Sequence, residues 1–150
     1  MNSIPPSKDF PSCFHRVTIK ALVVKDGKVL LLKEPKSLSG KWELPGGGLD
    51  FGEDIHAGLR REIEEELGVQ VASIDARPMY VWSWRYEQKR NMNWYYSLVV
   101  AYKVELASFD VKKTPEAEEI EFFSKEELEH IELNWQTNGL KQYFNPGDFV

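Results

Sequence analysis

Two glycine-rich turns and the helical pattern between them constrain the fold of this chain more than any other part of its sequence. A glycine cluster at 46–48 and Gly52 precede the pattern, and Gly68 follows it where a helix C-terminus favours a left-handed residue. Asp54 is suited to cap the helix N-terminus. The apolar residues recur every fourth position: Ile55, Leu59, Ile63 and Leu67. The segment therefore predicts one helix with an apolar stripe facing a core.

Three glutamates share one arc of this predicted helix, beside the apolar stripe. At 100° per residue Glu62, Glu65 and Glu66 are neighbours, whereas Glu64 points elsewhere. Because like charges this close repel one another, we expect a cation among them, and hard oxygen ligands suit Mg²⁺ or Mn²⁺. The alternative is an acidic helix face exposed to solvent.

The net charge of the chain is −5, and all of it lies within residues 47–69. This segment holds seven acidic residues and two arginines, whereas the rest of the chain holds seventeen of each. A metal site concentrates charge, while general solubility spreads charge over the surface. The acidic balance argues against broad nucleic-acid binding, but it is compatible with a nucleotide that binds together with its metal.

The order of residues in this segment resembles the Nudix box. Gly47 is followed after five residues by Glu53, and after seven more by Arg-Glu-Ile-Glu-Glu-Glu-Leu-Gly-Val at 61–69. The resemblance implies the Nudix fold, an α/β fold in which an α-β-α sandwich contains a mixed sheet. It also implies a Mg²⁺-dependent hydrolase that splits a nucleoside diphosphate linked to another moiety, such as a nucleotide, a dinucleoside polyphosphate or a nucleotide sugar.

The resemblance further implies roles for individual residues. The expected metal ligands are three carboxylates and one carbonyl group: Glu62, Glu65, Glu66 and Gly46. Glu62 or Glu65 is also expected to polarise the attacking water. Arg61 is expected to act at the site and to pair with Glu53, bracing the loop on the helix. The residues expected to support the site are Gly47, Glu53 and Gly68.

Nudix proteins also carry a further carboxylate before the final strand, and the acidic segment 116–123 resembles that region. Either Glu116 or Glu119 is a candidate, and we predict Glu119 as the catalytic residue. The alternative is that these glutamates form a solvated turn.

Aromatic residues alternate along a predicted strand at 80–86: Tyr80, Trp82, Trp84 and Tyr86. Period two gives this strand one aromatic face. Such a face stacks a nucleobase, packs a core or forms a homodimer interface, and the sequence leaves all three open. For the first of these, the expected substrate-binding residues are Trp82, Trp84 and Tyr86.

The remaining pattern predicts a single domain at 15–150, preceded by a flexible tail at 1–14. Strands at 17–24 and 28–34 are expected to form a hairpin around Asp26-Gly27. A second hairpin is expected between 80–86 and 94–104. Near the C-terminus, Ser124 and Glu127 predict a capping box, and a last helix is expected at about 135–143.

The sequence contains no apolar run that would serve as a signal peptide or cross a membrane. The single cysteine, Cys13, fits a reducing cytoplasm.

Subgroup markers outside the box do not select one substrate. The sequence before the box, Trp-Glu-Leu-Pro-Gly-Gly at 42–47, lacks the Phe-Pro-Gln-Gly-Gly form of RNA 5′-pyrophosphohydrolases, which lowers that alternative. Trp84 stands where some ADP-ribose hydrolases carry proline, and Tyr86 stands where diadenosine polyphosphate hydrolases carry tyrosine. A nucleotide sensor without hydrolysis is the alternative from another class, although its carboxylates are usually eroded and those of this chain are intact.

Overall fold

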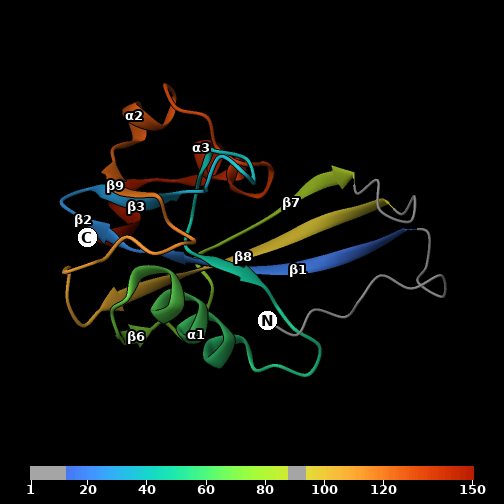
Figure 1. Cartoon of the computed structure of the whole chain (residues 1–150), viewed down its shortest axis with the longest axis horizontal. Helices are drawn as coiled ribbons and strands as arrows, with labels where there is room; N and C mark the ends of the chain where they lie inside the picture. Colours follow the sequence, from blue (N-terminus) through green and yellow to red (C-terminus); the bar gives the residue numbers. More distant parts are fainter. Residues whose placement is uncertain (1–12, 88–93) are drawn as a thin grey trace.

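Two β-sheets with helices on both sides make up the part of the chain described by the computed structural model, residues 13–87 and 94–150. Figure 1 shows the long helix α1 (Ile55–Leu67) on one side of the strands, and the short helices α2 (Lys125–Leu128) and α3 (Gly139–Tyr143) on the other. The predicted α/β sandwich is confirmed. Within the described ranges, no helix is long and apolar enough to span a membrane.

The first sheet brings the glycine cluster beside the N-terminal strand. Its order is β5-β1-β8-β6, and β7 also pairs with β8. β1 and β8 run parallel, whereas the other pairs are antiparallel, so the sheet is mixed. β5 therefore lies at an edge of the sheet, with Lys20 of β1 opposite Gly46. The bounds of its strands are β1 Cys13–Leu22, β5 Gly46–Gly48, β6 Val71–Ile74, β7 Tyr80–Glu87 and β8 Trp94–Leu106.

The second sheet is antiparallel, and it contains the predicted Asp26-Gly27 turn. Both residues of this turn have positive φ, 53° and 76°, as a two-residue hairpin turn of type I′ requires. The first strand of the predicted hairpin differs from the prediction, because β1 ends at Leu22 and belongs to the other sheet, leaving only β2 to pair with β3. The bounds are β2 Val24–Lys25, β3 Lys28–Lys33, β4 Trp42–Glu43 and β9 Glu119–Phe123.

The N-terminal boundary also differs from the sequence prediction. Strand β1 begins at Cys13, so the last two residues of the predicted tail form part of a strand. The rest of that tail, and residues 88–93 between the two strands of the second predicted hairpin, lie outside the described residues.

Helix α1 begins and ends where the sequence predicts. The Asp54 side chain accepts a hydrogen bond from the backbone N–H of Ala57, and Gly68 ends the helix with φ 67°. Leu59, Ile63 and Leu67 are fully buried in the core between α1 and the sheets. Burial of this stripe fixes the rotation of the helix and turns the arc that carries Glu62 and Glu66 toward β5.

The C-terminal elements cover the opposite core, which contains Leu128, Leu140 and Phe144. The predicted capping box of α2 is present at Ser124 and Glu127. The helix predicted at about 135–143 is instead a 3₁₀ turn, Trp135–Thr137, followed by α3. The Asn134 side chain caps the start of this turn by accepting a hydrogen bond from the N–H of Thr137, and α3 begins separately at Gly139.

Candidate active site

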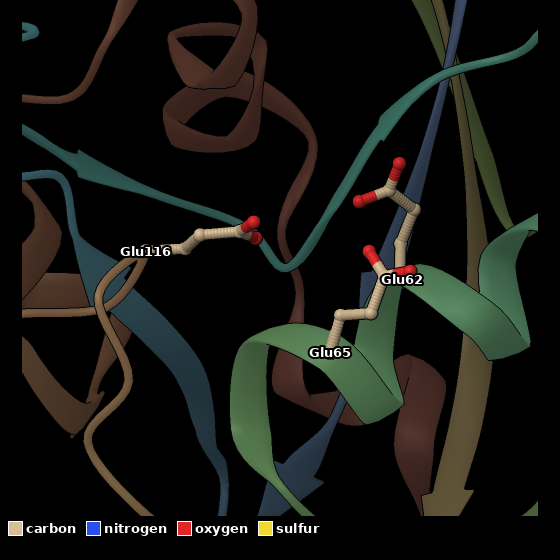
Figure 2. A group of neighbouring side chains, drawn as sticks. All are labelled: Glu62, Glu65 and Glu116. Atoms are coloured by element: carbon tan, nitrogen blue, oxygen red, sulfur yellow. The ribbon is translucent and has the colours of Figure 1, made fainter. Parts of the chain in front are cut away.

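Three carboxylates from distant parts of the sequence converge beside α1. Each of Glu62, Glu65 and Glu116 offers one oxygen within 4.8 Å of the others. Figure 2 shows the first two projecting from the helix and Glu116 approaching from the loop before β9. Glu62 is 5% exposed, whereas the other two are open to solvent. Hard oxygen ligands at this spacing and charge suit a divalent cation such as Mg²⁺.

The approach of Glu116 has a local structural cause. The Thr114 hydroxyl donates to the carbonyl oxygen of Glu66 at 2.9 Å and accepts from the N–H of Glu116 at 3.3 Å. This contact attaches the loop before β9 to the C-terminal turn of α1. Glu119 lies instead in β9, opposite Lys33, with its carboxylate 3.9 Å from the Lys33 ammonium. The geometry thus favours Glu116 over Glu119, against our prediction.

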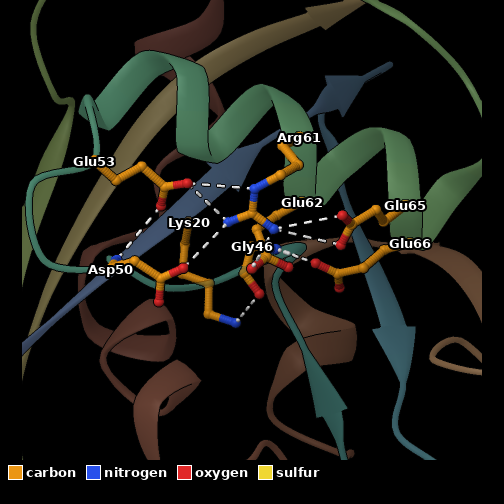
Figure 3. Close-up of polar contacts among 8 residues, drawn as sticks. All are labelled: Lys20, Gly46, Asp50, Glu53, Arg61, Glu62, Glu65 and Glu66. Atoms are coloured by element: carbon orange, nitrogen blue, oxygen red, sulfur yellow. Dashed lines mark hydrogen bonds and ion pairs between the residues drawn. The ribbon is translucent and has the colours of Figure 1, made fainter. Parts of the chain in front are cut away.

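Arg61 connects the helix to the loop that precedes it (Figure 3). Its guanidinium donates to Glu53 at 3.0 Å and 3.3 Å, and it lies 4.0 Å from Asp50. It also contacts Glu62 at 3.4 Å and Glu65 at 3.5 Å. The hydrogen bond to Glu53, more than the nearby carboxylates, raises the pKa of Arg61. The structure therefore contains the predicted Arg61–Glu53 pair, and the same guanidinium offsets repulsion between the helix glutamates.

Glu66 faces the glycine turn rather than the three clustered carboxylates. It is 3% exposed, and its Oε1 accepts a hydrogen bond from the N–H of Gly46 at 2.9 Å. Gly46 has φ 124°, and a Cβ there would collide with the carbonyl oxygen of Ile19, so only glycine fits. Burial raises the pKa of Glu66 well above its ordinary value, although Lys20 opposes the shift. Glu66 thus links α1 to the start of β5.

Little space is left for a side chain next to the carboxylate cluster. A Cβ at Gly47 would lie 3.0 Å from Oε1 of Glu62, so a side chain there would press on that carboxylate. Gly68 has its place at the helix end, where its left-handed conformation completes α1. Gly68 therefore meets a conformational requirement, whereas a side chain at Gly47 would only crowd the Glu62 carboxylate.

Lys20 is a site residue that the sequence analysis missed. It is 1% exposed in β1, and its ammonium donates to the carbonyl oxygens of Leu44 at 3.0 Å and Gly46 at 3.1 Å. The Glu43 carboxylate lies 3.5 Å away. The carbonyl group of Gly46, predicted as a metal ligand, therefore accepts from Lys20. The signal was a lysine inside an apolar strand, because a lysine is rarely buried without partners.

A second polar group lies beyond Lys20. The Asn134 amide donates at 2.6 Å both to Glu34 Oε1 and to Glu43 Oε2. Burial raises the pKa of Glu43 to about 7 even though Lys20 opposes the shift. Burial, together with Glu65 and Glu116, likewise raises the pKa of Glu62, while Arg61 lowers it.

A cavity of about 440 Å³ opens beside this polar group. Its wall includes Arg16, Trp135 and the backbone at Gly48, together with the two carboxylates that Asn134 joins. Its volume falls within the range of small-molecule sites. Because Gly48 belongs to β5, the cavity and the carboxylate cluster are separated by only one strand.

Two of the predicted aromatic substrate-binding residues, Trp82 and Trp84, are not among the described residues that line this cavity. Trp82 is 5% exposed, stacks on Tyr143 and donates from its indole to the carbonyl oxygen of Gln136 at 2.7 Å. It packs a core, one of the alternatives that the sequence left open. Trp84 is partly exposed elsewhere on β7, and the side chain of Tyr86 lies outside the described part. The aromatic side chain at the cavity is Trp135, which sequence reasoning had assigned to a helix.

Comparison with known proteins identifies relatives over most of the chain. The model of the family described as NUDIX domain matches residues 14–144. The nucleoside triphosphatase NudI of Escherichia coli O81 (strain ED1a) is 31% identical over 134 residues, which cover 82% of this chain and 92% of that protein.

Solved structures show the same fold. A MutT NUDIX hydrolase from Burkholderia pseudomallei is 28% identical with a TM-score of 0.57, over 75% of this chain and 85% of that one. A UDP-X diphosphatase has a TM-score of 0.64 at 23% identity, over 85% of this chain and 58% of that one. The family resemblance predicted from the sequence is confirmed.

Proposed function

This chain belongs to the Nudix family of hydrolases, and we propose that it cleaves, with Mg²⁺, a phosphoanhydride bond in a nucleoside diphosphate linked to another moiety. One observation carries the proposal: Glu62, Glu65 and Glu116 converge within 4.8 Å, with Glu62 against β5, the strand that also borders a cavity. Clustered carboxylates and a cavity for a small molecule are the two parts that such a reaction requires.

The donor set fits a hard divalent cation, Mg²⁺ or Mn²⁺, and the three clustered carboxylates would hold it. A bound Mg²⁺ would neutralise charge that develops on phosphate oxygens and would help to orient water. Arg61 holds Glu62 and Glu65 in place through contacts at 3.4 Å and 3.5 Å. Glu66 serves the site by fixing β5, through its hydrogen bond to Gly46.

A carboxylate must also accept a proton from the attacking water. Glu62 and Glu65 are the two candidates on the helix, and their environments differ because only Glu62 is buried. Because Mg²⁺ held by these carboxylates would lower the pKa of each, the burial of Glu62 in the metal-free protein does not decide between them. Comparing the pH–rate profiles of Glu62→Gln and Glu65→Gln tests this choice, since loss of the general base removes the acidic limb of the profile.

The substrate class to test first is the nucleoside triphosphates. The NudI relative, which is named a nucleoside triphosphatase, supports this class. In our proposal the nucleoside part occupies the cavity beside Asn134 and Trp135, and the phosphates extend past β5 toward the carboxylates. We also propose a cytoplasmic location, while a homodimer stays a prediction.

The test is product release from a panel of nucleoside triphosphates, dinucleoside polyphosphates, ADP-ribose, nucleotide sugars and 5′-triphosphorylated RNA, with and without Mg²⁺. We expect one substrate class to be hydrolysed, and only with metal. Glu62→Gln and Glu116→Gln should each lower the hydrolysis rate about tenfold or more, because each removes a carboxylate that would hold the metal. Glu119→Gln is the matched control and should retain activity, because its carboxylate is beside Lys33. Metal-dependent binding of a nucleotide without turnover would instead support a sensor. Near-normal rates in folded Glu62→Gln would contradict the proposal.

A further inference from the structure

The side chain of Arg16 lies in the cavity wall next to the backbone of β5. It projects from β1, and a Cβ built on Gly48 would lie 2.8 Å from its Nε and 2.9 Å from its Cζ, with Nη2 closer still. Gly48 does not have a positive φ, so the backbone conformation does not require glycine. The lack of a side chain at residue 48 is therefore what leaves room for the guanidinium.

Among the side chains that the structure describes, which leave out those of residues 85–87 and 94–95, none forms a hydrogen bond or ion pair with this guanidinium. Two carboxylates, Glu34 and Glu43, line the same cavity, but both are engaged by the Asn134 amide at 2.6 Å. By contrast, the guanidinium of Arg61 contacts four acidic side chains. A partly buried guanidinium that faces a cavity and has no partner among the described side chains is available to an anionic ligand.

The position of Arg16 relative to the carboxylate cluster follows from β5. Successive residues of a strand point to opposite sides, and Gly47 abuts Glu62 whereas Gly48 abuts Arg16. The carboxylates and the guanidinium thus lie on opposite sides of one strand. Because β5 is the edge strand of its sheet, no further strand of that sheet blocks a ligand from crossing its outer edge.

We propose that Arg16 binds a phosphate of the nucleotide, on the cavity side of β5, and thereby positions the scissile anhydride against the carboxylates on the other side. This inference rests on the proposed function and adds a residue to it. A guanidinium suits this role because its planar array of N–H groups binds two phosphate oxygens at once. In this arrangement Gly48 is a second determinant, since any side chain there displaces the guanidinium.

The experiment compares Arg16→Gln, Arg16→Lys and Gly48→Ala with the wild type, using the substrate found in the panel above. Two quantities are measured: KM and kcat in the presence of Mg²⁺, and the dissociation constant of a non-hydrolysable imidodiphosphate analogue of that nucleotide by calorimetry. Arg77→Gln is the matched control, because it removes one positive charge from an exposed site.

We expect Arg16→Gln to weaken analogue binding by about 10- to 100-fold, as loss of a charge-assisted hydrogen-bond pair predicts. KM should rise similarly, Arg16→Lys should recover part of the loss, and Arg77→Gln should bind like the wild type. Gly48→Ala should reproduce the Arg16→Gln defect, and combining the two should add little, because both remove the same contact. Thermal unfolding without ligand should shift little in Arg16→Gln, since the side chain has no described ion partner to lose.

The inference is overturned if wild-type protein hydrolyses the nucleotide while Arg16→Gln binds the analogue with unchanged affinity. A second result would also overturn it: Arg16→Gln lowers both the unfolding temperature and the affinity for the analogue, and Arg16→Lys recovers neither. That pattern indicates that the arginine has a structural role. Absence of hydrolysis in the wild type would contradict the proposed function instead, and the analogue-binding measurement separates the two failures.

Discussion

Glu43 should make the metal-free protein less stable as the pH rises from mildly acidic to neutral. Burial raises the pKa of its carboxyl from 4.5 to about 7, although Lys20 lies 3.5 Å away and opposes the shift. The folded protein therefore retains a proton at this site at pH values where the unfolded chain has released it. Stability falls with pH wherever the folded state binds more protons, so the loss occurs between about pH 4.5 and pH 7.

The magnitude follows from the size of the shift. Each pKa unit corresponds to about 1.4 kcal/mol, so ionising Glu43 in the folded protein should cost about 3 kcal/mol in total. Below pH 4.5 the cost disappears, because both states are protonated. Glu66 has a pKa shifted in the same direction and adds to the slope, so the effect of Glu43 must be isolated by substitution.

Glu43→Gln provides that isolation, because glutamine keeps the size and an oxygen that accepts from Asn134 but cannot ionise. Urea denaturation of both proteins, followed by tryptophan fluorescence between pH 4.5 and 8 with a chelator present, gives the unfolding free energies. The unfolding free energy of the variant minus that of the wild type should increase by about 3 kcal/mol from pH 4.5 to pH 8. Any effect of the substitution that does not depend on pH cancels in this comparison. If the ion pair with Lys20 outweighed burial, the wild type would instead gain stability as the pH rises, and the reasoning would be refuted.

Two further predictions concern buried contacts. Lys20→Met should reduce the unfolding free energy by about 3 kcal/mol at pH 8, because it leaves the carbonyl groups of Leu44 and Gly46 and the Glu43 carboxylate without their cation. The reduction should be smaller at pH 5, where Glu43 is protonated. Equal reductions at the two pH values would contradict this account. Gly139→Ala should reduce the unfolding free energy, measured by thermal unfolding, by about 1–3 kcal/mol, because the new Cβ would lie 2.5 Å from the ring of buried Trp82. Unchanged stability would contradict this prediction and show that the ring moves aside.

The parts of the fold that the sequence predicted are those determined by local interactions. Helix α1 has its period, its Asp54 cap and its Gly68 terminus within one continuous segment, and all three are present in the structure. The capping box at Ser124 is equally local. The helix predicted at about 135–143 is divided into a 3₁₀ turn capped by Asn134 and the short helix α3, and helical periodicity does not reveal this division.

The parts that the sequence did not predict depend on contacts between distant residues. Choosing between Glu116 and Glu119 required the register of β9 against β3, which pairs Glu119 with Lys33. It also required the contact of Thr114 with the carbonyl oxygen of Glu66, 48 residues away. The burial of Lys20 likewise depends on how β1 lies against β5. The sequence pattern carries no information on such pairings, because strands that alternate alike can pair in more than one register.

The structure shows which of the negative charges in the segment 47–69 already have protein partners. Glu53 is paired with Arg61, and Glu66 is occupied by the N–H of Gly46 in a nearly dry environment close to Lys20. Two of the seven acidic residues in the segment, Glu53 and Glu66, therefore already have protein partners. The negative charge that a cation can still neutralise lies where Glu62 and Glu65 meet Glu116, and Glu116 lies outside that segment. A count of charges along the chain locates the helix of the site, but the number of carboxylates that meet there depends on the loop before β9.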